Sequence, residues 1–263
     1  MLVFAAIVPH SPILIPSIGT EHQEKFARTL AAYKELEEAL YVARPETIII
    51  VSPHAHMYPD AFSGNASPHY RGVLKEFGDH GTTVRAKSDF LLLDHLHREL
   101  RREHVSFTLT SEEELDYGHT VPLLLLTTHL SDWKLVPLSP SLLDGRMHYT
   151  FGRSLYQLLQ AEQARIALIA SADLSHHVNS SSPAGENPEG QAFDAAVRRY
   201  VQERDVPALL AMDQHLLEKA DQCGYKPIVT LLGCLEQVNC HPKELCYEAP
   251  FGVGALTVRF DMA

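Results

Sequence analysis

Cysteine is scarce in this sequence and unevenly placed. The 263 residues include only four cysteines, all beyond residue 222, and no two of them form a CxxC pair. This distribution excludes the disulfide framework that staples many small secreted domains, and it favours a reducing compartment. We therefore expect a cytoplasmic protein.

Long apolar runs and a surplus of basic residues are also missing. No apolar run approaches the roughly 18 residues that a membrane helix needs. The start, MLVFAAIVPHSPIL, lacks a basic region and a small-residue cleavage site, so it is interpreted as a buried strand rather than a signal peptide. With 22 basic and 33 acidic residues, the formal net charge is −11. This charge argues against nucleic acid or an anionic membrane as partner, although it is compatible with a local positive pocket.

Short apolar segments alternate with segments of helical periodicity along the whole chain. The predicted core strands cover residues 3–8, 47–51, 135–138, 166–170 and 252–260. The predicted helices cover residues 20–40, 88–103, 121–129, 149–161, 191–203, 206–212, 215–220 and 227–238. Strands that alternate with helices indicate an α/β fold. We expect one domain over residues 1–263, with three α/β/α layers and a central mixed, largely parallel sheet.

Local signals predict where several helices begin. Thr20 to Gln23 form a capping-box pattern, Ser88 is expected to cap a second helix, and Val121-Pro122 is expected to open a third. Residues 57–87 contain many turn formers and are interpreted as an excursion of short strands. Residues 179–190 have the composition of a surface loop.

Histidine is abundant, with 16 in the chain, and several histidines follow predicted core strands. His10 follows the first strand, His54 and His56 follow the second, and His176 and His177 follow the strand at 166–170. A single histidine in such a place is more often a hydrogen-bonded loop residue than a ligand. Ligands of open α/β sheets bind beyond the carboxyl ends of the strands, so three such strands together predict a site at one rim. Two imidazoles and one anionic group suit Fe(II), Zn(II) or Mn(II).

Two further segments carry groups for acid–base chemistry. In SADLSHH, Asp173 could orient a neighbouring group or simply cap a turn, and His176 could act as general acid or base because imidazole titrates near neutrality. In DYGHTVPL, Gly118 allows close backbone approach, and His119 could either line the pocket or cap the following helix.

These segments resemble the class III extradiol ring-cleavage dioxygenases, whose fold is that of the B subunit of protocatechuate 4,5-dioxygenase. The chain is most similar to the Memo-like branch, called AmmeMemoRadiSam system protein B. The resemblance extends over nearly the whole sequence and depends on the order and spacing of seven segments. These are VPHSP (8–12), VSPHAH (51–56), LDYGHTVPL (115–123), SADLSHH (171–177), SPAGENPEGQAFD (182–194), QCGYKPIVTLLG (222–233) and YEAPFGVG (247–254).

The resemblance implies a metal site and a reaction. The dioxygenases hold Fe(II) with two histidines and a glutamate, and they cleave a catechol with O2. By position, the metal histidines are His10 and His54, and the histidine that handles protons is His176. The resemblance also implies a small aromatic substrate, and a homodimer or a pairing with a small second subunit.

The third metal ligand departs from the family's pattern. Cys223 stands where the dioxygenases carry glutamate, as it does in Memo-like relatives, and it could instead be a small buried hydrophobe. Glu218 and Glu248 are rival carboxylates. A thiolate is a soft ligand that suits Zn(II) or Cu(I) better than an iron that activates O2.

Two functions follow from this pattern. The first is a non-haem Fe(II) extradiol dioxygenase with His10, His54 and Cys223 as ligands, and with His176, His119 and Asp173 in the catalytic machinery. The second is a Memo-like protein that binds a metal or another ligand in the same pocket without ring cleavage. A zinc hydrolase has no local support, since neither HExxH nor GxSxG occurs.

Overall fold

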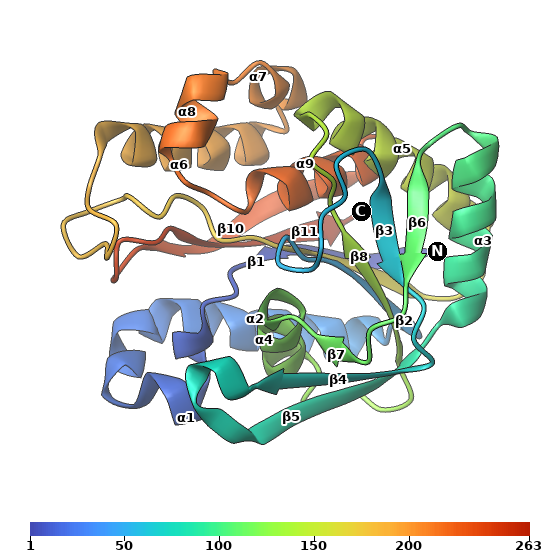
Figure 1. Cartoon of the computed structure of the whole chain (residues 1–263), viewed down its shortest axis with the longest axis horizontal. Helices are drawn as coiled ribbons and strands as arrows, with labels where there is room; N and C mark the ends of the chain where they lie inside the picture. The colour runs from blue at the N-terminus through green and yellow to red at the C-terminus, as the bar shows by residue number, and fades with distance from the viewer.

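The computed structural model describes all residues from Met1 to Ala263 and contains one large mixed sheet with helices on both faces (Figure 1). The strands are β1 (Leu2–Val8), β2 (Thr47–Val51), β3 (Phe62–Asn65), β4 (His69–Leu74), β5 (Asp79–Ser88), β6 (Phe107–Thr110), β7 (Glu114–Leu115), β8 (Lys134–Ser139), β9 (Ile166–Ser171), β10 (Cys240–Glu248) and β11 (Ala255–Met262). The α-helices are α1 (Pro16–Gly19), α2 (Ala27–Ala43), α3 (Phe90–Arg102), α4 (Tyr117–Leu126), α5 (Gly145–Ala161), α6 (Pro188–Glu203), α7 (Val206–Leu210), α8 (Gln214–Lys219) and α9 (Tyr225–Cys234). The predicted α/β class and the mixed sheet are confirmed.

The centre of the sheet brings together the strands that precede the histidines. The strand order is β10-β11-β1-β9-β2-β8-β5-β4-β7, and β3 and β6 branch off β8. Strands β1, β9, β2 and β8 are parallel neighbours, whereas β11 and β10 continue the sheet in antiparallel pairing. Every residue of β2 and β9 is buried, which explains why both strands are continuous apolar runs.

Helices cover each face of this central sheet. On one face, α2 and α4 pack through residues such as Leu36, Leu40 and Val121 against the even-numbered side chains of β1 and β2. On the other face, α3, α5, α6 and α9 enclose a larger cluster that includes Phe151 and Ile228. Each fully buried leucine or isoleucine stabilises the fold by roughly 1.5–3 kcal/mol relative to an exposed side chain.

The three helix starts predicted from local capping or proline signals all differ from the observed ones. Thr20 has a φ of 40° and ends α1, so it does not adopt the extended backbone of an N-cap; residues Thr20–Phe26 form a 3-10 helix and α2 begins only at Ala27. Ser88 is the last residue of β5, and Asp89 caps α3 by accepting from the backbone N–H of Leu92. Asp116 caps α4, which therefore begins four residues before Val121 and includes His119 in its first turn.

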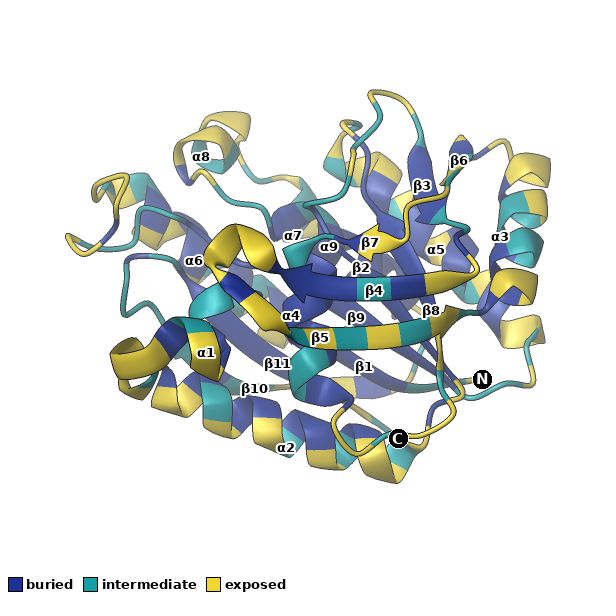
Figure 2. Ribbon diagram, turned by 60° about the horizontal axis from the view of Figure 1, so that its bottom comes forward, coloured by how far each residue is buried: buried dark blue, intermediate teal, exposed yellow.

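The segment expected to be an excursion forms β3, β4 and β5. The hairpin of β4 and β5 extends the sheet beyond β8, and in Figure 2 strand β5, which lies next to β8, alternates between exposed and half-buried residues over most of its length. Strand β10 was not predicted; it is an edge strand that carries charged residues and Pro242. The last strand begins at Ala255 rather than at the predicted Gly252. No helix is both long and apolar enough to cross a membrane.

Candidate metal centre

His10, His54 and Cys223 converge at the carboxyl end of the central strands. His10 lies two residues beyond β1, and His54 lies three residues beyond β2, on either side of β9. The Nε2 atoms of the two imidazoles are 2.9 Å apart, and Cys223 Sγ lies 3.4 Å from His10 Nε2. One ligand atom from each of the three residues lies within 4.8 Å of the others, so together they could hold a metal ion.

Hydrogen bonds fix the tautomer of His10, which is buried. Its Nδ1 is 2.8 Å from Ser171 Oγ, and the single hydroxyl proton of Ser171 is donated to the carbonyl of Gly118. Ser171 must therefore accept from His10 Nδ1–H. The lone pair of His10 Nε2 is then directed at His54 and Cys223. Burial lowers the pKa of His10, so the ring is neutral, as a metal ligand must be.

A proline in α4 makes the Gly118 carbonyl available for this contact. In a regular helix this oxygen would accept from the N–H of the residue four positions later, which is Pro122 and has no N–H. Gly118 is also required for space: a Cβ there would lie 2.4 Å from Ser52 Oγ and 3.0 Å from His54 Cδ2. The Gly-His-Thr-Val-Pro sequence therefore builds the outer support of both histidines.

Tyr117 holds the ring of His54. The two rings stack with centroids 4.2 Å apart, and the tyrosine hydroxyl lies 2.9 Å from His54 Nε2. Burial, with a smaller contribution from His10, lowers the pKa of His54 to about 4. His54 is therefore neutral at physiological pH.

Cys223 is placed by a contact between two loops. Ser175 and Gln222 form an isolated antiparallel bridge, which brings the loop between α8 and α9 alongside the segment after β9. Cys223 Sγ also donates to the Asp173 carbonyl at 3.6 Å, and burial raises the pKa of the thiol. The rival carboxylates are elsewhere: Glu218 is exposed on α8, whereas Glu248 accepts from the backbone and hydroxyl of Thr29 on α2.

Asp173 lies beside His10 but is not one of the three residues whose ligand atoms converge. Its Oδ1 accepts from the backbone N–H of His10 at 2.9 Å, and its Oδ2 lies 3.5 Å from His10 Nε2. The carboxylate therefore fixes the His10 loop and adds negative charge next to the ligand atoms.

His119 and Asp116 form a buried pair on the other side of Gly118. His119 Nδ1 lies 2.5 Å from Asp116 Oδ2, and Asp116 Oδ1 accepts from Ser52 Oγ at 2.6 Å. Burial opposes ionisation of Asp116, but the charge and hydrogen bond of His119 and the Ser52 hydroxyl outweigh it and hold the pKa of this carboxyl below its usual range. His119 Nε2 is buried without a hydrogen-bond partner. His119 does not cap α4, and its free nitrogen is an unused acceptor when Nδ1 carries the proton.

His176 is partly exposed, unlike the buried residues His10, His119 and Asp173. Its side chain is 34% exposed, and its Nδ1 lies 4.0 Å from Asp221 Oδ2. The backbone is fixed because His176 N donates to the Ala220 carbonyl and its own carbonyl accepts from Ser182 Oγ. A charge on His176 would depress the pKa of both His10 and His54, so it lies within electrostatic range of these two candidate ligands.

The supporting residues Ser171, Tyr117 and Asp116 were not identified from the sequence as parts of the site. Asp116 and His119 are three residues apart at a helix start, and this spacing could have indicated that they are paired. No comparable local signal marks Ser171 or Tyr117, because their partners are distant in sequence.

The fold is that of an α/β protein in which His10, His54 and Cys223, a group that could hold a metal ion, lie at the carboxyl rim of the sheet. The family described as the catalytic LigB subunit of aromatic ring-opening dioxygenase matches residues 4–258, so the chain belongs to this family. Protein CA_C1420 of Clostridium acetobutylicum is 26% identical over 257 residues, which are 94% of this chain and 55% of that protein. The chain thus spans about half the length of this relative.

A solved structure shares the fold. The uncharacterized protein JW3007 from Escherichia coli K12 superposes with a TM-score of 0.70 at 19% sequence identity, covering 98% of this chain and 99% of that one. At this identity the likeness supports the architecture described above and nothing more specific.

Proposed function

We propose that this protein is a metal-dependent oxidoreductase that opens the ring of a catechol-type aromatic with O2, beside one of its two hydroxyl groups. The main support for this proposal is that His10, His54 and Cys223 converge on one point. Burial lowers the pKa of both imidazoles and so keeps them neutral, as metal ligands must be. Membership of the ring-opening dioxygenase family supports the reaction class.

The donor groups fit a divalent metal. An ion bound at about 2.0–2.1 Å by two imidazoles in a tetrahedral site holds the nitrogens about 3.3 Å apart, close to the 2.9 Å between His10 and His54. Fe(II) is the ion we propose, with Zn(II) as the alternative that the Cys223 sulfur favours. When bound, the ion would act as a Lewis acid that lowers the pKa of a catechol hydroxyl and brings both reactants together.

We assign proton transfer to two histidines and a positioning role to Asp173. His119 Nε2, a buried acceptor without a partner, would take a proton from a substrate hydroxyl, and Asp116 would stabilise the resulting imidazolium. His176, which is partly exposed, would exchange protons with solvent as the second acid–base group. Asp173 would hold the His10 loop in place.

A second function is favoured by one specific observation. The thiol of Cys223 lies beside His10 and His54, while Glu218 and Glu248 lie elsewhere. This supports a metal-binding protein, or a ligand-binding one, that uses the same pocket without ring cleavage.

The two functions are separated by loading the protein with Fe(II) under anaerobic conditions and adding a panel of catechols and O2. Ring cleavage predicts a yellow product and one O2 consumed per product. Bound iron without turnover of any catechol would favour the second function. Wild-type protein that retains neither Fe(II) nor Zn(II) would contradict both metal proposals and leave a pure ligand-binding role.

Substitutions at Cys223 test the ligand assignment. We expect Cys223→Ala to lower the bound metal well below one ion per chain and Cys223→Glu to restore it, because glutamate supplies the carboxylate found in the dioxygenases. Cys234→Ala, at a buried cysteine outside the ligand group, is the matched control and should leave the metal content unchanged.

We further propose a homodimer or a small second subunit, which light scattering of the purified protein would detect.

A further inference from the structure

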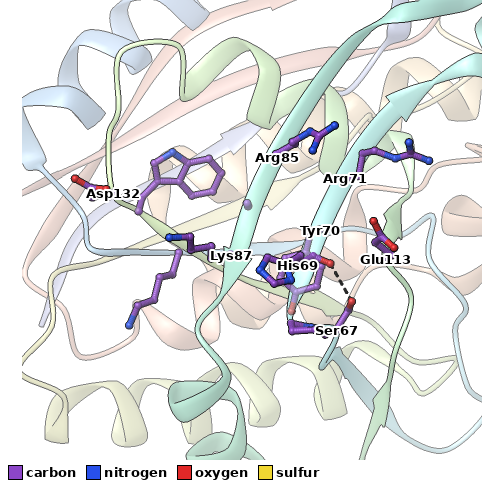
Figure 3. Close-up of a pocket in the computed structure, with 12 residues that line it drawn as sticks. Ser67, His69, Tyr70, Arg71, Arg85, Lys87, Glu113 and Asp132 are labelled. Carbon is purple, nitrogen blue, oxygen red and sulfur yellow. Dashed lines mark hydrogen bonds between the residues drawn. The ribbon is translucent and has the colours of Figure 1, made fainter.

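A cavity of about 710 Å³ lies on the uncovered face of the β4–β5 hairpin, lined in part by Ser67, Arg71, Arg85, Lys87 and Trp133. Figure 3 shows Arg71 and Arg85 on adjacent strands, with His69 and Lys87 further along the same two strands. The cavity adjoins the first residue of β8, whereas the metal centre lies beyond the opposite ends of β1 and β2. It is therefore a separate feature of the molecule.

Like charges face one another across this hairpin. Arg71 is directly opposite Arg85. Lys87 pairs in register with Lys134 on β8. Residues in register project from the same face of a sheet, and like charges placed in this way destabilise the pairing. The intervening Tyr70 and Ala86 pack into the core cluster, so the cationic side chains all lie on the outer face.

This positive charge is only partly neutralised within the protein. Arg71 pairs with Glu114 at 3.0 Å, and Lys134 lies 3.6 Å from Asp89. Arg85 and Lys87 are exposed and form no ion pair, and the Nε of Arg71 is buried without a hydrogen-bond partner. The acidic residues Glu113 and Asp132 also line the cavity, but four basic side chains, those of Arg71, Arg85, Lys87 and Lys134, outnumber them. In a chain with a net charge of −11, this local excess of positive charge is an exception that an anionic ligand would complement.

We propose that this cavity binds a small phosphorylated ligand that carries a planar ring, the chemical class of nucleotides. Guanidinium groups recognise phosphate through paired hydrogen bonds, and Lys87 and Lys134 add positive charge around the same space. Trp133 supplies an aromatic surface for a planar ring. The volume lies within the range of small-molecule sites, whereas a nucleic acid would meet the repulsion of the whole chain.

Trp133 is the only tryptophan of the chain, so its fluorescence reports on this cavity directly. The 263-residue chain would be titrated with ATP, AMP, tripolyphosphate and adenosine at low salt, and binding would be confirmed by calorimetry. We expect saturable binding of ATP and AMP with a change in tryptophan emission, weaker binding of tripolyphosphate, and no binding of adenosine. Affinity should fall as salt is added.

Charge-reversal variants localise the binding. Arg85→Glu combined with Lys87→Glu should raise the dissociation constant for ATP at least tenfold. Lys34→Glu is the control, because it reverses the charge of an exposed lysine on α2 that forms no ion pair. This variant should bind ATP as wild type does. The double variant Arg85→Ala, Lys87→Ala should lose binding as well, yet unfold at the same or a higher temperature, because the facing like charges are removed.

Several outcomes would overturn the proposal. They are no binding of any nucleotide at millimolar concentration, equal loss of binding in Lys34→Glu, or binding of a single-stranded oligonucleotide in preference to mononucleotides. His10→Ala should retain nucleotide binding, which separates this site from the metal centre. Loss of nucleotide binding in that variant, with the fold intact, would also contradict a separate site.

Discussion

Replacing Ser171 with alanine tests how the protein prepares His10 to bind a metal. The serine hydroxyl links His10 Nδ1 to the Gly118 carbonyl, and both Ser171 and His10 are buried. Without it, His10 Nδ1–H and the carbonyl lose their partner, which should lower the free energy of unfolding by about 1–3 kcal/mol. The ring also loses the contact that directs Nε2 to the site. Loss of such a supporting contact typically weakens metal binding by about 10–100-fold, or about 1.4–2.8 kcal/mol.

The two effects are measured separately. Metal affinity is obtained by competition with a chelating dye, and stability by urea unfolding in EDTA. Ser141→Ala is the control, because this serine is equally buried and its hydroxyl accepts from Leu143 N away from the three ligands. Its metal affinity should be unchanged. If Ser171→Ala binds metal as tightly as wild type, or if both variants weaken binding equally, the role assigned to Ser171 is wrong.

Three further predictions concern stability. Thr257→Val should stabilise the protein by about 1 kcal/mol in urea unfolding, because the threonine hydroxyl is buried without a hydrogen bond; a loss of stability would contradict this. Gly152→Ala should destabilise the protein by about 1–3 kcal/mol or more, since its Cβ would lie 2.1 Å from the Thr230 carbonyl where α5 crosses α9, and an unchanged melting temperature would refute the close packing. Burial raises the pKa of Asp194 to about 7, so this carboxyl contributes stability that is lost as the pH rises from about 4 to 7, whereas the lowered pKa values of His10 and His54 contribute in the opposite direction. The free energy of unfolding of wild type minus that of Asp194→Asn, from urea titrations at several pH values, should therefore fall through this window, and a difference that rises would have the wrong sign.

The central strands and their histidines could be predicted because their signals are local. A run such as TIIIV at 47–51 is buried on both faces in the structure, as its continuous apolar character indicated. His10 and His54 follow such runs directly, so the topology alone brings them to one rim. Strand β10 was missed because it lies at the edge of the sheet, where charged side chains and Pro242 are tolerated.

The third ligand and the supports of the site depend on contacts between distant segments. Nothing near Cys223 in the sequence indicates that Gln222 bridges to Ser175 and so places the thiol beside His10. The role of Pro122 is similar: the sequence marks it as a helix opener, whereas in the structure its missing N–H frees a carbonyl for Ser171.

The charges around the three ligands explain why a cation would be retained there. Burial lowers the pKa of His10 and raises that of the Cys223 thiol, so neither residue carries a charge without a metal. Asp116 is held ionised, and the Asp173 carboxylate lies 3.5 Å from His10 Nε2. Negative charge is therefore concentrated next to neutral donors in a buried space, where it is poorly screened. A divalent ion would relieve this imbalance, and its binding would favour loss of the Cys223 thiol proton. Metal affinity should therefore increase with pH in wild type, and this pH dependence should be lost in Cys223→Ala.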